Sequence, residues 1–153
     1  MTPATKLLKK HRINFDLLSY EHNPKDQNFG LEAVEKLNLP AEKVFKTLVL
    51  ETSEQTLIVA ITPVSQQINL KQLAKACKAK KVYMAAPQKV ENSTGYILGG
   101  VSPLGQKKRL ATYLHASAEK FETIYVSAGK RGLEIAVSPN CLLNLCNGQY
   151  ANF

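Results

Sequence analysis

A lysine stands in the middle of an otherwise apolar segment, VFKTLVL, at residues 44–50. The segment predicts a β-strand, and because side chains alternate between the two faces of a strand, Lys46 shares a face with Val44 and Leu48. An ammonium group among aliphatic side chains is costly unless an anion or several acceptors meet it, so Lys46 is a candidate for binding an anionic substrate. The alternative is structural, because a lysine can also guard an exposed strand edge or lay its stem on apolar surface with its charge in water.

A second candidate is the segment STGYILGGVSPLGQKK at residues 93–108, which is rich in glycine and proline. Five residues require its backbone to turn or to approach another group closely: Gly95, Gly99, Gly100, Pro103 and Gly105. A glycine-rich loop is most often only a turn, and this one lacks the Gly-Lys-Ser ending of a nucleoside-triphosphate cradle. The chain also contains no GxSxG motif and no dinucleotide-binding fingerprint.

The remaining reactive side chains predict neither a metal centre nor a covalent nucleophile. The histidines stand alone, without ligand-like spacing to a cysteine or a second histidine: His11, His22 and His115. The cysteines fall on predicted helices, are odd in number and form no CxxC pair: Cys77, Cys141 and Cys146. We therefore expect no metal and no cofactor. The cysteine usage and the N-terminal sequence, which lacks the apolar core of a signal peptide, favour a cytoplasmic protein with no membrane partner.

The formal net charge of +8 and the pI near 9.4 suit a polyanionic partner such as RNA, because neutralised phosphates release counterions. Basic residues cluster in three places: Lys6, Lys9, Lys10 and Arg12; Lys71, Lys75, Lys78, Lys80 and Lys81; and Lys107, Lys108 and Arg109. The spacing of Lys71, Lys75 and Lys78 equally fits a solvated helix face. Charge alone therefore leaves nucleic-acid binding open.

These candidates must be positioned by helices and strands that alternate without a regular βαβ rhythm. Helices are predicted from Thr2 and Pro3 to about Arg12, at 31–37, after Asn69, from Pro87, and from Ser138 and Pro139 to Gly148. Strands are predicted at 13–20, 44–50, 56–64, 80–85 and 109–115, with a hairpin at 122–138 around AGKRG. We expect a single domain, residues 1–153, of the α+β class, with a mixed, strongly curved, barrel-like sheet and helices packed outside.

Three segments in combination, VFKTL, STGYILGGVSPLGQKK and IYVSAGKRGLEI, carry a resemblance to a known family. In order and separation they resemble the YbaK type of aminoacyl-tRNA deacylase, the family that includes the editing domain of bacterial prolyl-tRNA synthetase. The resemblance extends to TPATKLLKK, YEHNP, NFG and LKQLAKA and spans Thr2 to about Leu145. Within the family, the chain is most similar to the free-standing branch that hydrolyses cysteine from mischarged proline tRNA.

The resemblance implies a set of site residues. Lys46 matches the lysine that projects into the substrate pocket and holds the aminoacyl end of the tRNA through the terminal phosphate or ribose. Gly99 and Gly100 match a loop whose backbone N–H groups polarise the ester carbonyl. The remaining matches are substrate-binding positions: Tyr20, Phe29, Thr47, Ser127 and Glu134. Several relatives carry aspartate where this chain has Glu134, so the contact of the longer side chain is left open.

The residues themselves allow a plainer interpretation of several of these positions. Tyr20 and Phe29 fit ordinary core aromatics, and Glu134 fits a strand-edge charge paired with Lys130 or Arg131. The side chain of Thr47 is expected on the strand face opposite Lys46.

The chain offers no convincing nucleophile, and the resemblance implies that none is needed. The substrate's own thiol would attack its ester carbonyl and leave as a cyclic thioester, while the protein supplies positioning, a polarising loop and a pocket of limited size. The implied partners are mischarged proline tRNA and prolyl-tRNA synthetase, which would recruit the protein. The competing hypothesis is a non-catalytic module that binds tRNA or a synthetase, with Lys46 as a phosphate contact.

Overall fold

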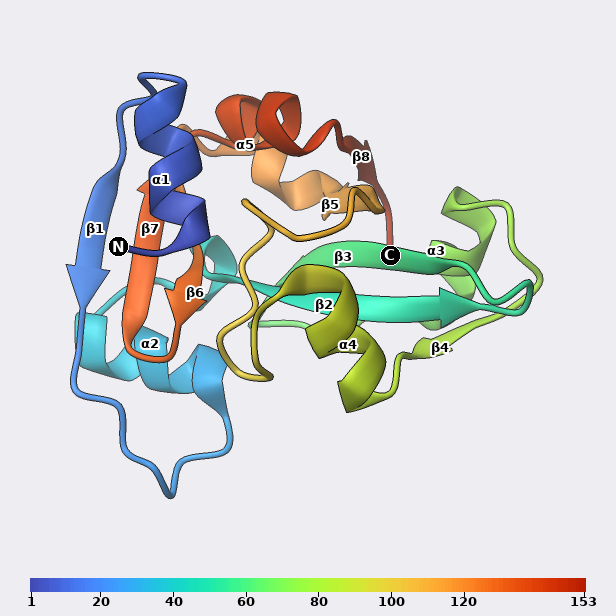
Figure 1. The fold of residues 1–153 in the computed structure, drawn as a ribbon, viewed down its shortest axis with the longest axis horizontal. Coiled ribbons are helices and arrows are strands. Elements are labelled where there is room, and N and C mark those ends of the chain that lie inside the picture. The colour runs from blue at the N-terminus through green and yellow to red at the C-terminus, as the bar shows by residue number, and fades with distance from the viewer.

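The computed structural model describes every residue from Met1 to Phe153 and shows a mixed α+β fold with two sheets (Figure 1). The helices are α1 (Pro3–Lys10), α2 (Phe29–Leu37), α3 (Leu70–Ala76), α4 (Pro87–Thr94) and α5 (Pro139–Cys146), with two short 3-10 segments, η1 (Ala41–Lys43) and η2 (Ala116–Lys120). The strands are β1 (Asp16–Ser19), β2 (Phe45–Thr52), β3 (Leu57–Pro63), β4 (Val82–Met84), β5 (Ala111–His115), β6 (Ile124–Lys130), β7 (Leu133–Val137) and β8 (Gln149–Ala151). The predicted α+β class is confirmed.

The eight strands form two separate sheets instead of the one curved, barrel-like sheet that the sequence predicts. A three-stranded antiparallel sheet has the order β1-β7-β6, and a mixed five-stranded sheet has the order β4-β2-β3-β5-β8. The one backbone bridge between the two sheets is the isolated one that pairs Val44 with Tyr125. Because the hydrogen-bond ladder does not continue past this bridge, the sheets stay distinct and no closed barrel forms.

Two apolar clusters hold the layers together. The larger joins both sheets to α1 and α5, and the smaller packs the opposite face of the five-stranded sheet against α3. Strand alternation explains the division, since Val49 faces the larger cluster while its neighbour Leu50 faces the smaller one. The five-stranded sheet is therefore covered on both faces.

Several predicted helix ends are confirmed by their caps. Thr2, Asn69 and Ser138 each accept a hydrogen bond from the backbone in the first turn of the following helix. The lysine-bearing helix α3 is shorter than predicted, because it ends at Ala76 and Lys78 adopts a left-handed conformation with φ of 60°. Lys78 therefore does not extend the helix face.

The predicted strand at residues 13–20 is also shorter, since β1 covers only Asp16–Ser19. It is followed by Tyr20, whose N–H donates to the Gly132 carbonyl at 2.9 Å. The predicted hairpins are confirmed: β2 pairs with β3 and β6 pairs with β7, both antiparallel.

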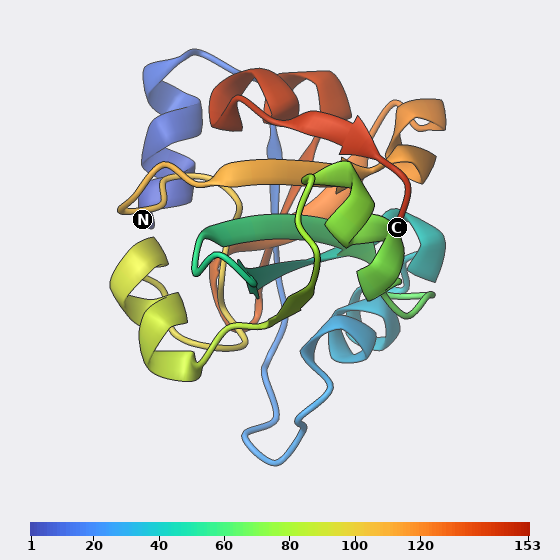
Figure 2. The same cartoon turned by 90° about the vertical axis from the view of Figure 1, so that its right-hand side faces the viewer.

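The long axis of the molecule separates α1 from α3. Figure 1 places α1, β1 and the β6–β7 hairpin at one end and α3 at the other, and Figure 2 brings α3 and the C-terminal residues to the front. None of the helices has the length and apolar character needed to cross a membrane.

Candidate active site

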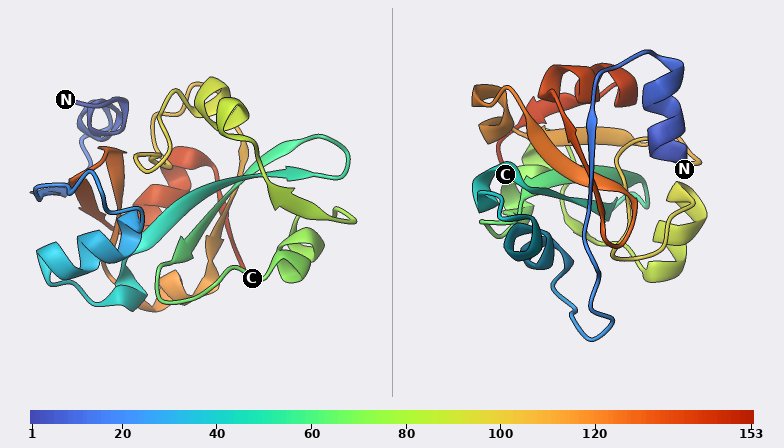
Figure 3. Two further views of the ribbon diagram at one scale, coloured as in Figure 1. Left: turned by 90° about the horizontal axis from the view of Figure 1, so that it is seen from below. Right: turned by 90° about the vertical axis from the view of Figure 1, so that its left-hand side faces the viewer.

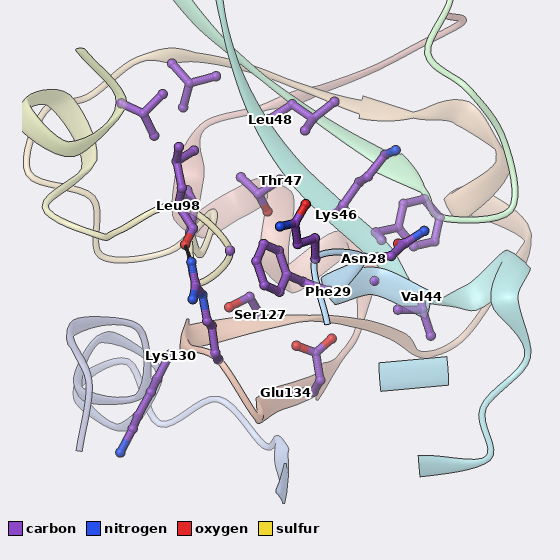
Figure 4. A pocket seen from close by; sticks show the side chains of 18 of the residues that line it. Asn28, Phe29, Val44, Lys46, Thr47, Leu48, Leu98, Ser127, Lys130 and Glu134 are labelled. Carbon is purple, nitrogen blue, oxygen red and sulfur yellow. Dashed lines mark hydrogen bonds between the residues drawn. The ribbon is translucent and has the colours of Figure 1, made fainter. Parts of the chain in front are cut away.

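A cavity of about 400 Å³ beside β2 gathers the residues that the sequence singles out. Its walls come from α2, β2, the segment after β4, the loop after α4 and the β6–β7 hairpin (Figure 4). Seven of the eight predicted site residues line it: Tyr20, Phe29, Lys46, Thr47, Gly99, Ser127 and Glu134. Segments that are far apart in the sequence therefore meet at one place in the fold.

The cavity occupies a gap along one edge of β2. The other edge is paired with β3 along nearly its whole length. On the cavity side, Val44 forms the isolated bridge to Tyr125, and the next contact is the hydrogen bond from Ala85 N–H to the Val49 carbonyl at 3.1 Å. Between these two points β2 has no neighbouring strand, so side chains from both of its faces reach the cavity.

Thr47 presents several polar groups to this gap. The Val44 carbonyl accepts from Val64 on the β3 side, and backbone groups alternate between the edges of an antiparallel strand, so the N–H and C=O of Thr47 face the cavity side. Its hydroxyl oxygen is buried and has no hydrogen-bond partner within the protein. Since buried hydroxyls nearly always find a partner, the unpartnered Thr47 oxygen is an exception in this cavity wall.

The side chain of Lys46 is exposed, and its ammonium group forms no ion pair or hydrogen bond with the protein. Its aliphatic neighbours Val44 and Leu48 also line the cavity. In Figure 4 the Lys46 side chain leaves β2 in a different direction from that of Thr47 and points away from Glu134. Lys46 therefore lies where β2 has no neighbouring strand and where its backbone forms part of the cavity wall, so its binding role stays a prediction.

The two glycines of the predicted polarising loop are placed differently. Gly99 lines the cavity with φ of +85°, and its N–H has no acceptor within the protein. Gly100 is buried, is not part of the lining, and donates its N–H to the Ile97 carbonyl at 3.0 Å. The second N–H of the predicted loop is therefore engaged in a turn, and Gly99 alone offers a free donor.

Arg131 fixes this loop to the opposite wall. Its guanidinium Nη2 donates to the Leu98 carbonyl at 2.7 Å and its Cζ lies 4.4 Å from the centre of the Phe29 ring. Phe29 is therefore a wall residue held by a cation–π contact and not a core aromatic. From the sequence, Arg131 is expected only as a partner for Glu134, and its contact with the loop is not predicted.

Glu134 is buried on the hairpin side of the cavity, directly across the strand pair from Ser127 (Figure 4). It forms no ion pair with Lys130 or Arg131, so the pairing that the residues alone suggest does not occur. Burial raises the pKa of its carboxyl group to about 8. At neutral pH the group is therefore largely a neutral acid until a cation approaches it.

Tyr20 stands next to this acid. Burial raises the pKa of its phenol to about 12, and the negative charges of Glu134 and Glu32 act in the same direction. The phenol thus remains protonated and can donate a hydrogen bond into the cavity.

Behind Tyr20 and Phe29, a buried carboxylate fastens the turn between them. Glu32 accepts from the Asn23 N–H at 2.8 Å, from Lys36 Nζ at 3.1 Å and from His22 Nδ1 at 2.5 Å. Burial by itself would raise the pKa of Glu32, but these hydrogen bonds outweigh it and lower the pKa to about 2.

This cluster around Glu32 is not predicted from the sequence. Its signal was the i, i+4 spacing of Glu32 and Lys36, which is also typical of a solvated helix pair. Within the predicted helix at 31–37, the apolar Leu31 is 42% exposed whereas the acidic Glu32 is 1% exposed. No group of three or more His, Cys, Asp or Glu side chains converges on a possible metal position.

The arrangement combines an unpaired cation, a free backbone donor, a buried hydroxyl and a neutral buried acid around apolar walls. Among the lining residues there is no cysteine and no histidine. Such a cavity can bind and polarise an anionic, ester-containing ligand, but it contains no nucleophile–base pair of the usual kind.

Comparisons with known proteins identify the family of the chain. Residues 30–145 match the family described as the aminoacyl-tRNA editing domain. The chain is 40% identical over 151 residues to a protein of Enterococcus faecalis named "Putative Cys-tRNA(Pro)/Cys-tRNA(Cys) deacylase EbsC", covering 98% of this chain and 91% of that protein. It is 25% identical over 108 residues to an uncharacterised Bacillus subtilis protein, YwhH, covering 71% of this chain and 68% of that one.

Solved structures show the same fold. One described as "a putative trans-editing enzyme for prolyl tRNA synthetase" superposes with a TM-score of 0.82 at 19% identity, covering 98% of this chain and 93% of that chain. The chain therefore belongs to the aminoacyl-tRNA editing domain family, as the resemblance of its motifs implies.

Proposed function

We propose that this protein is an aminoacyl-tRNA deacylase that edits in trans, releasing cysteine from mischarged proline tRNA and from cysteine tRNA. The observation that carries the proposal is that the unpaired Lys46, the free Gly99 N–H and the buried Glu134 carboxyl all line one apolar cavity. The substrate named for the 40% identical relative supports the choice of cysteine.

Different polar groups around the cavity bind different parts of such a substrate. Lys46 binds the phosphate or ribose of the terminal nucleotide, and the Gly99 N–H donates to the ester carbonyl. The carboxyl pKa of Glu134 is raised to about 8 by burial. The positive charge of the amino acid's α-ammonium group favours the ionised carboxylate, which then accepts a hydrogen bond from that group. Tyr20, Phe29, Thr47 and Ser127 complete the walls and limit the size of the amino-acid side chain.

The bond-breaking step uses the substrate's own sulfur. The cysteinyl thiol attacks its ester carbonyl carbon, a carbon–sulfur bond forms, the carbon–oxygen bond to the ribose breaks, and the thiol proton ends on the departing ribose oxygen. The products are free tRNA and a cyclic thioester, which water then opens to cysteine. The absence of cysteine and histidine from the cavity lining supports this route.

Because the chain is small, we assign the selection of proline tRNA to a partner protein. In this proposal prolyl-tRNA synthetase binds the tRNA and recruits the deacylase. The competing function, a non-catalytic tRNA-binding module, would use the same exposed lysine but would have no need for the free Gly99 N–H or the buried Glu134 carboxyl.

Incubation of the purified protein with Cys-tRNA(Pro), with release of cysteine followed over time, tests the function directly. Lys46→Ala should abolish the release of cysteine. Lys46→Arg should also release cysteine slowly, because the planar guanidinium group of arginine does not occupy the same point as the lysine ammonium group. Stability should change by less than about 0.5 kcal/mol, because Lys46 is exposed and unpaired.

Lys80→Ala is the matched control, because Lys80 is also exposed and lies outside the cavity lining. It should retain wild-type turnover. A folded Lys46→Ala variant with near-normal activity would refute the assignment of Lys46, and a wild-type protein that binds Cys-tRNA(Pro) without hydrolysing it would establish the binding module instead.

A further inference from the structure

The positive charge of this protein is unevenly distributed along the chain. Residues 1–15, 92–118 and 123–133 contain no aspartate or glutamate. They contain nine of the 20 basic residues: Lys6, Lys9, Lys10, Arg12, Lys107, Lys108, Arg109, Lys130 and Arg131. The rest of the chain holds eleven basic and twelve acidic residues, so the whole positive excess resides in these three segments.

The three segments meet in the folded protein. The Thr2 hydroxyl donates to the Ala128 carbonyl at 2.5 Å, which joins the start of α1 to β6. A β-carbon added to Gly105 would lie 2.6 Å from the backbone of Pro3, so the loop after α4 packs directly on α1. Figure 3 (left) shows α1 and this loop on the same side of the sheets. We call the surface formed by the nine side chains the basic face.

A second, smaller cavity of about 230 Å³ lies within this face. Leu7 of α1, the consecutive residues Lys107, Lys108 and Arg109, and Cys146 of α5 are among its lining residues. Eight of the nine basic side chains are exposed, Arg131 being intermediate, and none of the nine forms an ion pair with a carboxylate. By contrast, Lys36 and Lys89 elsewhere in the chain are paired with Glu32 and Glu51.

The basic face reaches the rim of the candidate active site. Lys130 and Arg131 belong both to this face and to the lining of the cavity beside β2. Lys107 is close to the start of the glycine loop, since its N–H donates to the Thr94 carbonyl at 3.0 Å and its β-carbon would lie 3.7 Å from one added to Gly95. The lysines of α3, in contrast, lie at the far end of the molecule from α1 (Figure 1).

We infer that the basic face binds the sugar–phosphate backbone of the double-helical acceptor stem of tRNA, while the aminoacylated 3′ end of the same molecule enters the cavity beside β2. This inference rests on the proposed function for the nature of the substrate. A set of nine cations without carboxylate partners, on segments that pack together and reach the lining of the cavity beside β2, fits a regular polyanion that binds through counterion release. The α3 lysines are not part of the footprint.

Charge reversal of matched triplets tests this inference. Two variants reverse the basic face, Lys6→Glu/Lys9→Glu/Lys10→Glu and Lys107→Glu/Lys108→Glu/Arg109→Glu. The control, Lys71→Glu/Lys75→Glu/Lys80→Glu, makes the same change of charge on and beside α3, where all three lysines are exposed. Binding of uncharged proline tRNA is measured for each over a range of salt concentrations, and thermal unfolding verifies that each variant folds.

Each basic-face variant should weaken tRNA binding by about tenfold or more and reduce the slope of log affinity against log salt by roughly 2, because each lost phosphate contact removes about 0.7–0.9 from that slope. The control should lose less than about threefold through the change in net charge alone. If a reversed triplet fails to fold, the corresponding Lys→Gln and Arg→Gln triplet replaces it, with the same direction of change expected.

A second substrate separates this inference from the proposed function. All three variants should hydrolyse a short cysteinyl-CCA ester with wild-type kcat/KM, since it lacks the stem, whereas the basic-face variants should lose kcat/KM on full-length Cys-tRNA(Pro). Equal tRNA affinity of the basic-face variants and the control overturns the footprint even if deacylation is normal. Failure of the wild-type protein to hydrolyse either ester refutes the deacylase function, while the binding series still decides the footprint.

Discussion

His22 Nδ1 and Glu32 Oε1 lie 2.5 Å apart, and the Glu32 side chain is only 1% exposed. The pair connects the turn after β1 to the first turn of α2, and the lining residues Tyr20 and Phe29 flank the same turn. His22 also packs its ring against that of Phe29 at a centroid distance of 5.7 Å. The shape of one cavity wall therefore depends on a carboxylate that does not itself reach the cavity.

Replacement of this carboxylate should lower stability in a pH-dependent manner. Glu32 has its pKa lowered from 4.5 to about 2 in the folded protein, so its stabilisation is present above about pH 4.5 and is lost as the pH falls toward 2. Glu32→Gln should reduce the free energy of unfolding at neutral pH by roughly 1–3 kcal/mol and flatten the acid limb of the stability curve. Urea unfolding across the acid range measures both effects.

Glu35→Gln is the control for this experiment, since Glu35 lies on the same helix but is exposed and its side chain forms no ion pair. It should leave the acid limb unchanged. Parallel acid limbs for the wild-type protein and Glu32→Gln would show that the Glu32 hydrogen bonds do not stabilise the fold.

Glu134 should produce the opposite dependence. Its carboxyl pKa is raised from 4.5 to about 8, so the folded protein keeps a proton that the unfolded chain releases, and stability falls as the pH rises through this interval. Glu134→Gln should remove this loss, which is at most about 5 kcal/mol by the pH 8 end. Thermal unfolding from about pH 4 to 9 measures the difference, with exposed Glu122→Gln as the control. A constant difference between wild type and Glu134→Gln across this range would contradict the raised pKa.

Gly99 should tolerate no side chain. A β-carbon there would lie 2.6 Å from Arg131 Nε and 2.7 Å from Phe29 Cε2, at a φ of +85°. Gly99→Ala should therefore displace the contact that holds the loop and abolish deacylation. Gly95→Ala is a matched control, because Gly95 has a similar φ of +80° but its nearest neighbour would be Lys107 at 3.7 Å. Gly95→Ala should lose about 1–2 kcal/mol of stability through its φ alone, Gly99→Ala should lose more because of the close contacts, and only Gly99→Ala should lose activity. Equal activities would remove Gly99 from the site.

The cysteines of the protein should be dispensable for turnover. None lines the cavity beside β2, and burial raises the pKa of the Cys146 thiol to about 11, which disfavours a reactive thiolate. Cys77→Ser, Cys141→Ser and Cys146→Ser, singly or together, should stay within a few-fold of wild-type turnover on Cys-tRNA(Pro). Loss of activity in a folded single variant would restore a covalent enzyme mechanism.

The thiol that matters should belong to the substrate. The same tRNA charged with serine, whose hydroxyl fills a similar volume but is a far weaker nucleophile, should be hydrolysed much more slowly than the cysteine form. Single-turnover rates on the two esters provide the measurement. Equal rates would exclude attack by the substrate's thiol and point to an activated water.

Local chemistry made much of the fold predictable. Proline at the first position of α1, α4 and α5, and the Thr2, Asn69 and Ser138 caps, mark helix starts through groups adjacent in sequence. The two hairpins follow from apolar runs separated by turn residues. The separation into two sheets was not predictable, because it depends on how far β6 runs alongside β2, which no local pattern records.

The candidate site likewise combines residues that the sequence predicts with contacts that only tertiary packing determines. Lys46 and the glycine loop stand out in the sequence, and the family motifs imply most of the lining. The contact of Arg131 with Leu98 and Phe29 and the burial of Glu32 arise from tertiary packing, which overrides the helical pattern around Leu31. The engagement of the Gly100 N–H in a turn likewise depends on the local course of the loop.

The cavity beside β2 is an interruption in a hydrogen-bond ladder, and this determines how such a site can diverge. Its length is fixed by two stopping points, the Val44–Tyr125 bridge and the Ala85–Val49 hydrogen bond. Extending β4 by one residue pair, or β6 by one bridge, would shorten the opening by about 3.3 Å without altering any lining side chain. Under the proposed function, relatives with identical site residues would then accept amino acids of different size. The lengths of β4 and β6, and not the identities of the lining residues, would determine that difference in specificity.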